Sequence, residues 1–219
     1  MRTVIAGGHG QIALRLSRIL RARGDEPVGL IRRPEQAEEV RAAGAEPLLI
    51  DLESAAVGEA AEALKGADAV VFAAGAGPGS GVARKDTVDR AAAVLLADAA
   101  EVAGVRRYLM ISSMGADANS AFEGDPVFRA YLRAKGAADD YLRERTDLDW
   151  TVLRPGSLRN DPGTGRVLLG PRTGRGAIPR DDVAAVLAEL LVSPGTAGLT
   201  LELIGGVTPI PEAIAEVLG

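Results

Sequence analysis

Two side chains with complementary proton chemistry, Tyr131 and Lys135, lie four residues apart in a segment with a helical pattern. Residues at this spacing share one face of a helix, so the phenol and the ammonium can act on the same molecule. An ammonium group stabilises a phenolate, which makes the neighbouring phenol a usable proton donor. The alternative is a surface pair on an amphipathic helix, because Tyr-x-x-x-Lys also occurs by chance.

A glycine-rich turn follows the first apolar segment and opens the first helical segment, and it comprises Gly7, Gly8, His9, Gly10, Gln11, Ile12 and Ala13. In this context Gly7 allows a tight turn, Gly10 lets the backbone approach a pyrophosphate, and Ala13 allows the helix to pack closely on the strand. The helix N-terminus then offers free N–H groups to phosphates. The sequence therefore predicts a dinucleotide site. We expect His9 to be a loop residue beside the pyrophosphate rather than a catalytic base.

The residues that follow the second and third strands indicate which dinucleotide is bound. Arg32 and Arg33 directly follow the second strand, where an NAD site usually places an acid. A guanidinium suits a ribose 2′-phosphate, so we expect NADP, with NAD as the less favoured cofactor. The alternative is a solvated pair at a helix start. After the third strand, Asp51 and Leu52 are expected to flank the adenine, although Asp51 also fits a turn or a helix cap.

The periodicity of apolar residues predicts a doubly wound α/β fold of the Rossmann type, with a parallel sheet and a short C-terminal elaboration. Strands are expected at 3–6, 27–31, 46–50, 69–73, 107–112, 150–154, near 167 and at 199–204, and helices at 11–23, 34–43, 59–65, 87–103, 126–145, 181–191 and from 211. We expect residues 1–219 to form one NAD(P)-binding domain, in which residues 155–219 supply the substrate-side wall. The glycine-rich loop 75–85 is expected to act as a flap beside the nicotinamide.

The composition excludes several classes of site. The chain has no cysteine and one histidine, which excludes thiolate chemistry and a histidine-rich metal centre, so no metal site is expected. A net charge of −5 argues against a nucleic-acid partner. No apolar run is long enough to span a bilayer and no signal peptide is evident, so we expect no membrane association and a cytoplasmic location.

Across almost its full length the chain resembles the atypical short-chain dehydrogenase/reductase family, related to NmrA-like, biliverdin-reductase-B-like and NAD-dependent epimerase/dehydratase-like proteins. The resemblance rests on the order and spacing of several motifs: Gly7–Ala13, Arg32-Arg33, Asp51-Leu52, Ala73-Ala74-Gly75, Ser112-Ser113, Tyr131 with Lys135, Arg154-Pro155-Gly156, and Asp182-Val183-Ala184. One position departs from the pattern, since Met114 stands where the family's catalytic Ser or Thr often falls.

The resemblance implies roles for the matching residues. Tyr131 would exchange the substrate proton, Lys135 would also hold the nicotinamide ribose, and Ser113 or Ser112 would replace the missing hydroxyl. The remaining cofactor contacts would come from Ala73, Ala74 and Gly75 at the adenosine and ribose, from Ser112 and Ser113 near the nicotinamide, and from Pro155, Gly156, Ser157 and Leu158 around its ring.

These expectations converge on an NADP(H)-dependent oxidoreductase that acts on a small molecule as a monomer or homodimer. Two other functions stay open. One is a non-catalytic NAD(P)-binding redox sensor, which the missing third hydroxyl favours, and the other is an epimerase or dehydratase that retains its cofactor.

Overall fold

The computed structural model describes residues 1–77 and 79–219, and within them nine strands form one sheet in the order β11-β8-β10-β6-β5-β4-β1-β2-β3. A parallel pair, β7 and β9, lies apart from that sheet. The strands are β1 (Arg2–Ala6), β2 (Glu26–Ile31), β3 (Glu46–Leu49), β4 (Ala69–Phe72), β5 (Arg107–Ile111), β6 (Asp149–Pro155), β7 (Ser157–Arg159), β8 (Arg166–Gly170), β9 (Ala177–Pro179), β10 (Leu199–Gly205) and β11 (Thr208–Pro209).

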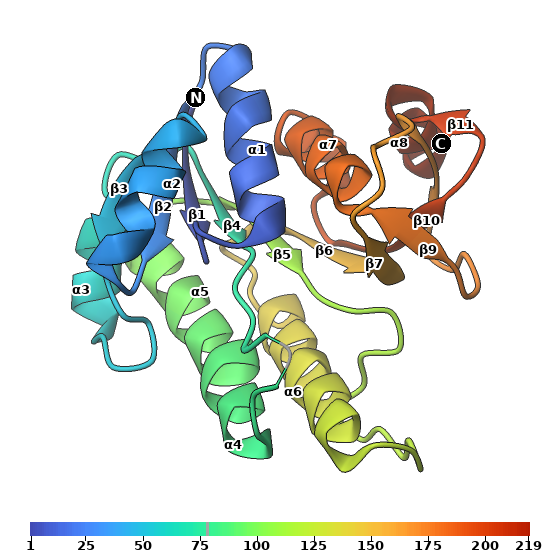
Figure 1. The fold of residues 1–219 in the computed structure, drawn as a ribbon, viewed down its shortest axis with the longest axis horizontal. Coiled ribbons are helices and arrows are strands. Elements are labelled where there is room, and N and C mark those ends of the chain that lie inside the picture. The colour runs from blue at the N-terminus through green and yellow to red at the C-terminus, as the bar shows by residue number, and fades with distance from the viewer. Residues whose placement is uncertain (78) are drawn as a thin grey trace.

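Helices cover both faces of the sheet, with α3, α5 and α6 on one side and α1 and α7 on the other (Figure 1). The helices are α1 (Gln11–Ala22), η1 (Pro34–Gln36), α2 (Ala37–Ala42), α3 (Val57–Leu64), α4 (Val82–Arg84), η2 (Lys85–Ala91), α5 (Ala92–Ala103), α6 (Pro126–Arg143), α7 (Arg180–Leu191), η3 (Pro194–Thr196) and α8 (Ile210–Leu218). The predicted Rossmann-type α/β class is confirmed.

The sheet is parallel from β3 to β10, and only β8 and β11 run antiparallel to their neighbours. After β3 the chain crosses back to β4, which pairs with β1 on its other side. The loops after β1 and β4 therefore diverge at the carboxyl edge of the sheet, and such a switch point is where open α/β sheets bind ligands.

The strand side chains alternate between two apolar layers. Val4 and Ala6 of β1 pack in the layer that contains α3 and α5, whereas Ile5 packs in the layer that contains α1 and α7. Because both faces are covered, the central strands are apolar on both sides, as parallel sheets require. Alanines at the helix–sheet contacts let the helices approach the strands closely, and this places the loops at the sheet edge accurately.

The segment after β4 differs from its expected structure. The helix expected to begin at Thr87 begins at Val82, and Lys85–Ala91 is π-helical before the α-helix continues. The expectation of a loop over 75–85 therefore holds only in part, and its residue 78 lies outside the described residues. Asp181 and Asp182 lie in the first turn of α7. They accept hydrogen bonds from the backbone N–H groups of Gly163, Thr164 and Gly165, and so hold a turn against the start of the helix.

Candidate functional site

A cleft of about 990 Å³ lies at the carboxyl edge of the sheet and joins the glycine-rich turn to the face of α6. Many of the residues expected at the site line it together: Gly10, Gln11, Ile12, Ala73, Ala74, Gly75, Ser112, Ser113, Tyr131, Lys135, Pro155, Gly156, Ser157 and Leu158. Seven expected cofactor residues do not line it: Gly7, Gly8, His9, Arg32, Arg33, Asp51 and Leu52. The volume lies at the upper end of the usual range for small-molecule and cofactor sites.

Each glycine of the turn meets a different steric demand. Gly7 has a φ of 75°, in the left-handed region that favours glycine, and its carbonyl accepts the N–H of Gly10 at 2.7 Å. Gly8 lies so close to β2 that an added Cβ would stand 2.5 Å from the Cα of Gly29. Gly8 therefore allows the turn and β2 to approach each other closely. This contact was not evident from the sequence.

Gly10 precedes α1 and faces the cleft. An added Cβ there would meet only the carbonyl oxygen of Gly7 at 3.0 Å and the carbonyl of Ala73 at 3.8 Å. The N-terminus of the 12-residue helix α1 opens beside it, and the first-turn N–H groups of a helix have no intrahelical acceptors. Small residues beside exposed donors fit a dinucleotide pyrophosphate.

Replacing Gly10 by valine is expected to abolish dinucleotide binding in a folded protein. The branched side chain would occupy the space in which the pyrophosphate approaches the helix, and each lost hydrogen bond to a charged group weakens binding by about 1.5–3 kcal/mol. Isothermal calorimetry should show at least a roughly tenfold to hundredfold loss. Gly58→Val is the matched control, because a Cβ at Gly58 meets nothing within 4 Å. Normal binding by Gly10→Val would mean that the turn has only a structural role.

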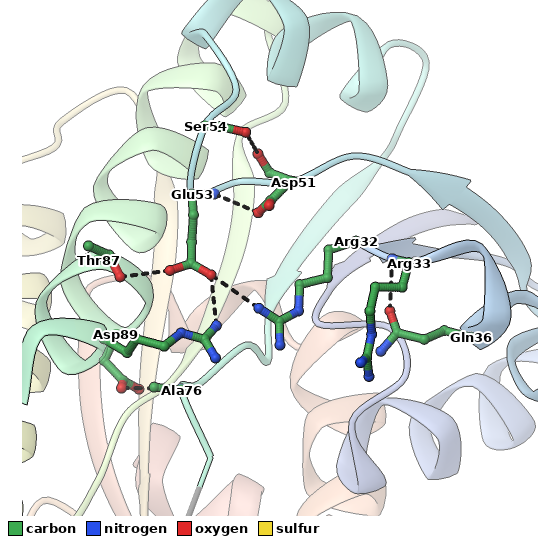
Figure 2. A network of polar contacts seen from close by, with 10 residues as sticks. Arg32, Arg33, Gln36, Asp51, Glu53, Ser54, Ala76, Thr87 and Asp89 are labelled. Atoms are coloured by element: carbon green, nitrogen blue, oxygen red, sulfur yellow. Dashed lines mark hydrogen bonds and ion pairs between the residues drawn. The ribbon is translucent and has the colours of Figure 1, made fainter. Parts of the chain in front are cut away.

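The other residues around the predicted adenosine end take part in contacts within the chain. The imidazole Nε2 of His9 contacts the Glu39 carboxylate rather than the cleft. Asp51 accepts the N–H of Glu53 at 3.0 Å and thus forms a turn, which was the alternative considered from the sequence, while Leu52 packs against the core. Arg32 pairs with Glu53 at 3.2 Å (Figure 2).

The end of β5 contributes hydroxyl groups to the floor of the cleft. Ser112 is buried, and its hydroxyl interacts with the buried Asp139 carboxylate of α6. The Ser113 hydroxyl donates to the carbonyl of Met114 at 3.3 Å. Both serines remain predicted contacts.

Tyr131 and Lys135 both line the cleft from α6, as their spacing predicts. The Tyr131 ring stacks on Phe128, with centroids 5.8 Å apart, and the ammonium of Lys85 lies 5.3 Å from the centroid of the Tyr131 ring. The ammonium group near the Tyr131 ring is thus that of Lys85, which sequence reasoning missed. Lys85 belongs to the π-helical segment, and such segments are frequent at functional sites.

Lys135 is buried rather than solvated. Its ammonium lies 3.4 Å from the Asp89 carboxylate and donates to the carbonyls of Ile111 at 3.1 Å and Ala74 at 3.4 Å. Asp89 also accepts the N–H of Ala76 at 3.3 Å. The ammonium thus joins the ends of β4 and β5 to the π-helical segment. If the Lys135 ammonium also contacts a ribose, as the resemblance implies, that contact would be made in addition to these interactions within the chain.

A second buried pair holds α6 in place. The guanidinium of Arg154 on β6 donates to the Asp139 carboxylate at 2.8 Å and 2.7 Å, one turn beyond Lys135. Burial raises the pKa of Asp139, whereas the charge of Arg154 and hydrogen bonds from Ser112 and Arg154 oppose this shift. Gly136 between them packs so tightly that a Cβ would lie 2.2 Å from the backbone N of Ala118. The helix that carries Tyr131 is therefore braced on two sides.

The C-terminal segment supplies another wall of the cleft. Gly156 donates its N–H to Leu203 at 2.9 Å, and a Cβ there would stand 2.3 Å from the carbonyl of Gly176. The glycine is thus required by the close approach of two backbone segments, whether or not a nicotinamide packs on it. Arg175 and Arg180 line the same cleft. Sequence reasoning missed both arginines, because nothing in their local pattern indicates that the fold brings them to the sheet edge.

Comparisons with known proteins agree with this geometry, since the NAD(P)H-binding family matches residues 7–194. The chain belongs to this family. YhfK from Bacillus subtilis, named an uncharacterized sugar epimerase, is 36% identical over 99% of this chain and 100% of its own. A putative NAD-dependent epimerase/dehydratase from Bacillus halodurans has a solved structure that is 38% identical, covers 99% of this chain and 100% of its own, and superimposes with a TM-score of 0.90.

A third relative carries another name. The oxidoreductase ylbE from Lactococcus lactis is 27% identical, with a TM-score of 0.88 over 100% of this chain and 97% of its own. Membership confirms a nicotinamide dinucleotide as the ligand class of this NAD(P)H-binding protein. Because these relatives carry different names, the reaction and the choice between NADP and NAD have to be argued from the residues of the site.

Proposed function

We propose that this NAD(P)H-binding protein is an NADP(H)-dependent oxidoreductase that acts on a small molecule. One observation carries the proposal: a single cleft is lined both by the end of the glycine-rich turn and by Tyr131 and Lys135. A cofactor laid along the carboxyl edge of the sheet would have its pyrophosphate at α1 and its nicotinamide beside α6. A substrate in the remaining space would then meet the Tyr131 phenol.

The roles we propose for the residues follow from their contacts. The nicotinamide, when bound, supplies or accepts a hydride. Tyr131 donates the proton that a reduced carbonyl or conjugated system needs, and the Lys85 ammonium near its ring favours the phenolate that remains. Lys135 shapes the floor below the ribose, and Ser113 orients the substrate at the end of β5.

The walls of the cleft suggest the class of substrate. The chain has only one Trp, three Tyr and three Phe, yet Phe122, Phe128 and Tyr131 gather at this cleft. Phe122 and Phe128 are 39% and 42% exposed, and with Tyr131 they form a contiguous group of rings, as is common at binding sites. Together with Arg175 and Arg180, these rings suit a planar, unsaturated compound that carries a negative charge.

The protein is expected to bind NADP(H) more tightly than NAD(H). Arg32 and Arg33 follow β2, and a lost charge-assisted contact to phosphate costs about 1.5–3 kcal/mol, or one to two decades in affinity. Calorimetric titration of both cofactors against the wild type and the Arg32→Ala/Arg33→Ala variant measures this preference. The variant should lose NADP affinity and keep NAD affinity. Equal affinities of the wild type for the two cofactors would contradict the choice of NADP.

Two other functions have specific support. The names of the relatives from Bacillus subtilis and Bacillus halodurans favour an epimerase or dehydratase, which would purify with tightly held nucleotide. Met114 stands where the family's catalytic Ser or Thr often falls, and the absence of that hydroxyl favours a redox sensor that binds the cofactor without catalysing a reaction. Mass spectrometry of the purified protein, followed by NADPH consumption with quinones, flavins and aldehydes, separates the three. Consumption of NADPH with release of reduced product is the result expected for an oxidoreductase.

Within the described residues, no helix is both long and apolar enough to cross a membrane. We propose a protein that works on its small-molecule substrate without a nucleic-acid or membrane partner, as a monomer or homodimer.

A further inference from the structure

One carboxylate, that of Glu53, holds together three segments at the predicted adenosine end of the site. Its Oε2 accepts from Arg32 at 3.2 Å and from Arg84 at 2.7 Å, and its Oε1 accepts from the Thr87 hydroxyl at 2.7 Å. Figure 2 shows the Arg32 side chain reaching Glu53 from the end of β2 and the Thr87 side chain reaching it from η2. Desolvation alone would raise the pKa of Glu53, but hydrogen bonds from Thr87 and Arg84 and the two arginine charges hold it below its ordinary value.

The shared oxygen atom defines a binding position for an anion. Because Oε2 is within reach of both guanidinium groups, any oxygen that replaced it would contact Arg32 and Arg84 at the same time. Two guanidinium groups and a hydroxyl are a donor set typical of phosphate recognition. Arg32 is also the residue that the sequence places at the ribose 2′-position.

The Glu53 carboxylate is positioned so that a phosphate could displace it from the two arginines. Its side chain is 25% exposed and those of Arg32 and Arg84 are 42% and 38% exposed, so the carboxylate can turn toward solvent without leaving a buried charge. A phosphate carries more negative charge than a carboxylate and offers three oxygens, so it is the stronger ligand for the pair. A carboxylate and a phosphate cannot both bind between the Arg32 and Arg84 guanidinium groups without strong electrostatic repulsion.

We propose that Arg84 joins Arg32 in binding the ribose 2′-phosphate, and that Glu53 is an internal carboxylate that competes with this phosphate for the two arginines. This inference rests on the proposed binding of NADP. NAD has a hydroxyl at this position and leaves the ion pairs of Glu53 in place. Glu53 therefore restrains the preference for NADP, and the strength of its ion pairs sets the ratio of the two affinities.

The test is a set of calorimetric titrations with NADP and NAD on four proteins: the wild type, Glu53→Gln, Arg84→Gln and Arg90→Gln. Glutamine keeps the shape of Glu53 and removes its charge, so NADP affinity should rise about tenfold while NAD affinity changes less than about threefold. Arg84→Gln should lower NADP affinity about tenfold and spare NAD. Arg90→Gln is the matched control, because Arg90 forms an equivalent ion pair with Asp86 on the same helical segment but does not contact Glu53, and both affinities should stay unchanged.

Unchanged or weaker NADP binding by Glu53→Gln would overturn the competition, and unchanged NADP binding by Arg84→Gln would overturn the phosphate contact. Circular dichroism and thermal unfolding check that each variant is folded, and Glu53→Ala provides a second neutral variant with the same expected direction. These failures differ from a failure of the proposed function. A wild type that binds neither dinucleotide refutes the cofactor site, whereas a wild type that binds NADP with an unaltered ratio in the variants refutes this inference alone.

Discussion

Lys135→Ala is expected to destabilise the folded protein by roughly 3–5 kcal/mol, the usual cost of removing one partner from a buried ion pair. The Asp89 carboxylate is fully buried, and the Lys135 ammonium is its only ionic partner among the described residues. In the variant, the carboxylate would keep only the backbone N–H of Ala76 at 3.3 Å. Urea unfolding with an unchanged slope and a much lower midpoint is the expected measurement.

The double variant Lys135→Ala/Asp89→Asn separates this electrostatic effect from lost packing. Neutralising Asp89 removes the unpaired charge, so the double variant should be more stable than Lys135→Ala alone, and the double-mutant cycle should give a coupling of at least about 1 kcal/mol. Destabilisation below about 1 kcal/mol in Lys135→Ala would mean that water or another group reaches Asp89. Measured well below its unfolding transition, the same variant should also show weaker NADPH binding if the ammonium contacts the ribose as proposed.

The sequence predicted the sheet and the main helices because their signals are local. The run Thr3–Ala6 is apolar on both faces, as a covered parallel strand must be, and the turn after it has a composition that opens a helix. The order of strands and helices along the chain then predicts a doubly wound parallel sheet. The gathering of Tyr131, Lys135 and the serines after β5 at one edge is a consequence of that order.

The contacts that were missed depend on packing between distant segments. Nothing in residues 85–91 distinguishes a π-helix from an α-helix, yet this π-helical segment carries both Lys85, which lies near the Tyr131 ring, and Asp89, which pairs with Lys135. Gly8 and Gly29 are far apart in sequence, and only the close approach of the turn to β2 explains why neither bears a side chain. Periodicity reports which face a residue is on, and not which distant side chain meets it there.

The contacts of Glu53 were missed for the same reason, because they join segments that are distant in the sequence. Glu53 follows the third strand in a polar turn, where an exposed acid is ordinary, and its partners Arg32 and Arg84 come from two other segments. The sequence alone therefore indicated an arginine pair at 32 and 33 facing a phosphate. In the structure Arg32 is already paired with a carboxylate, and a second arginine, Arg84, shares that partner. The positive charges of Arg32 and Arg84 are therefore partly offset by the Glu53 carboxylate, which the arginine pair in the sequence did not indicate.

Tyr131→Phe is expected to lower turnover by about 10²–10⁴-fold while NADPH affinity stays within about twofold, because a positioned acid typically contributes that much to a rate. The ring would remain stacked on Phe128 and near Lys85, so only the proton donor is lost. Tyr141→Phe is the matched control: it removes a hydroxyl from the same helix, but one that donates to Asp98 at 2.7 Å and does not line the cleft. Steady-state NADPH oxidation and calorimetry on both variants measure the two effects separately. If Tyr131→Phe kept full activity toward every accepted substrate, the proton would have to come from water, and α6 would only form a wall of the site.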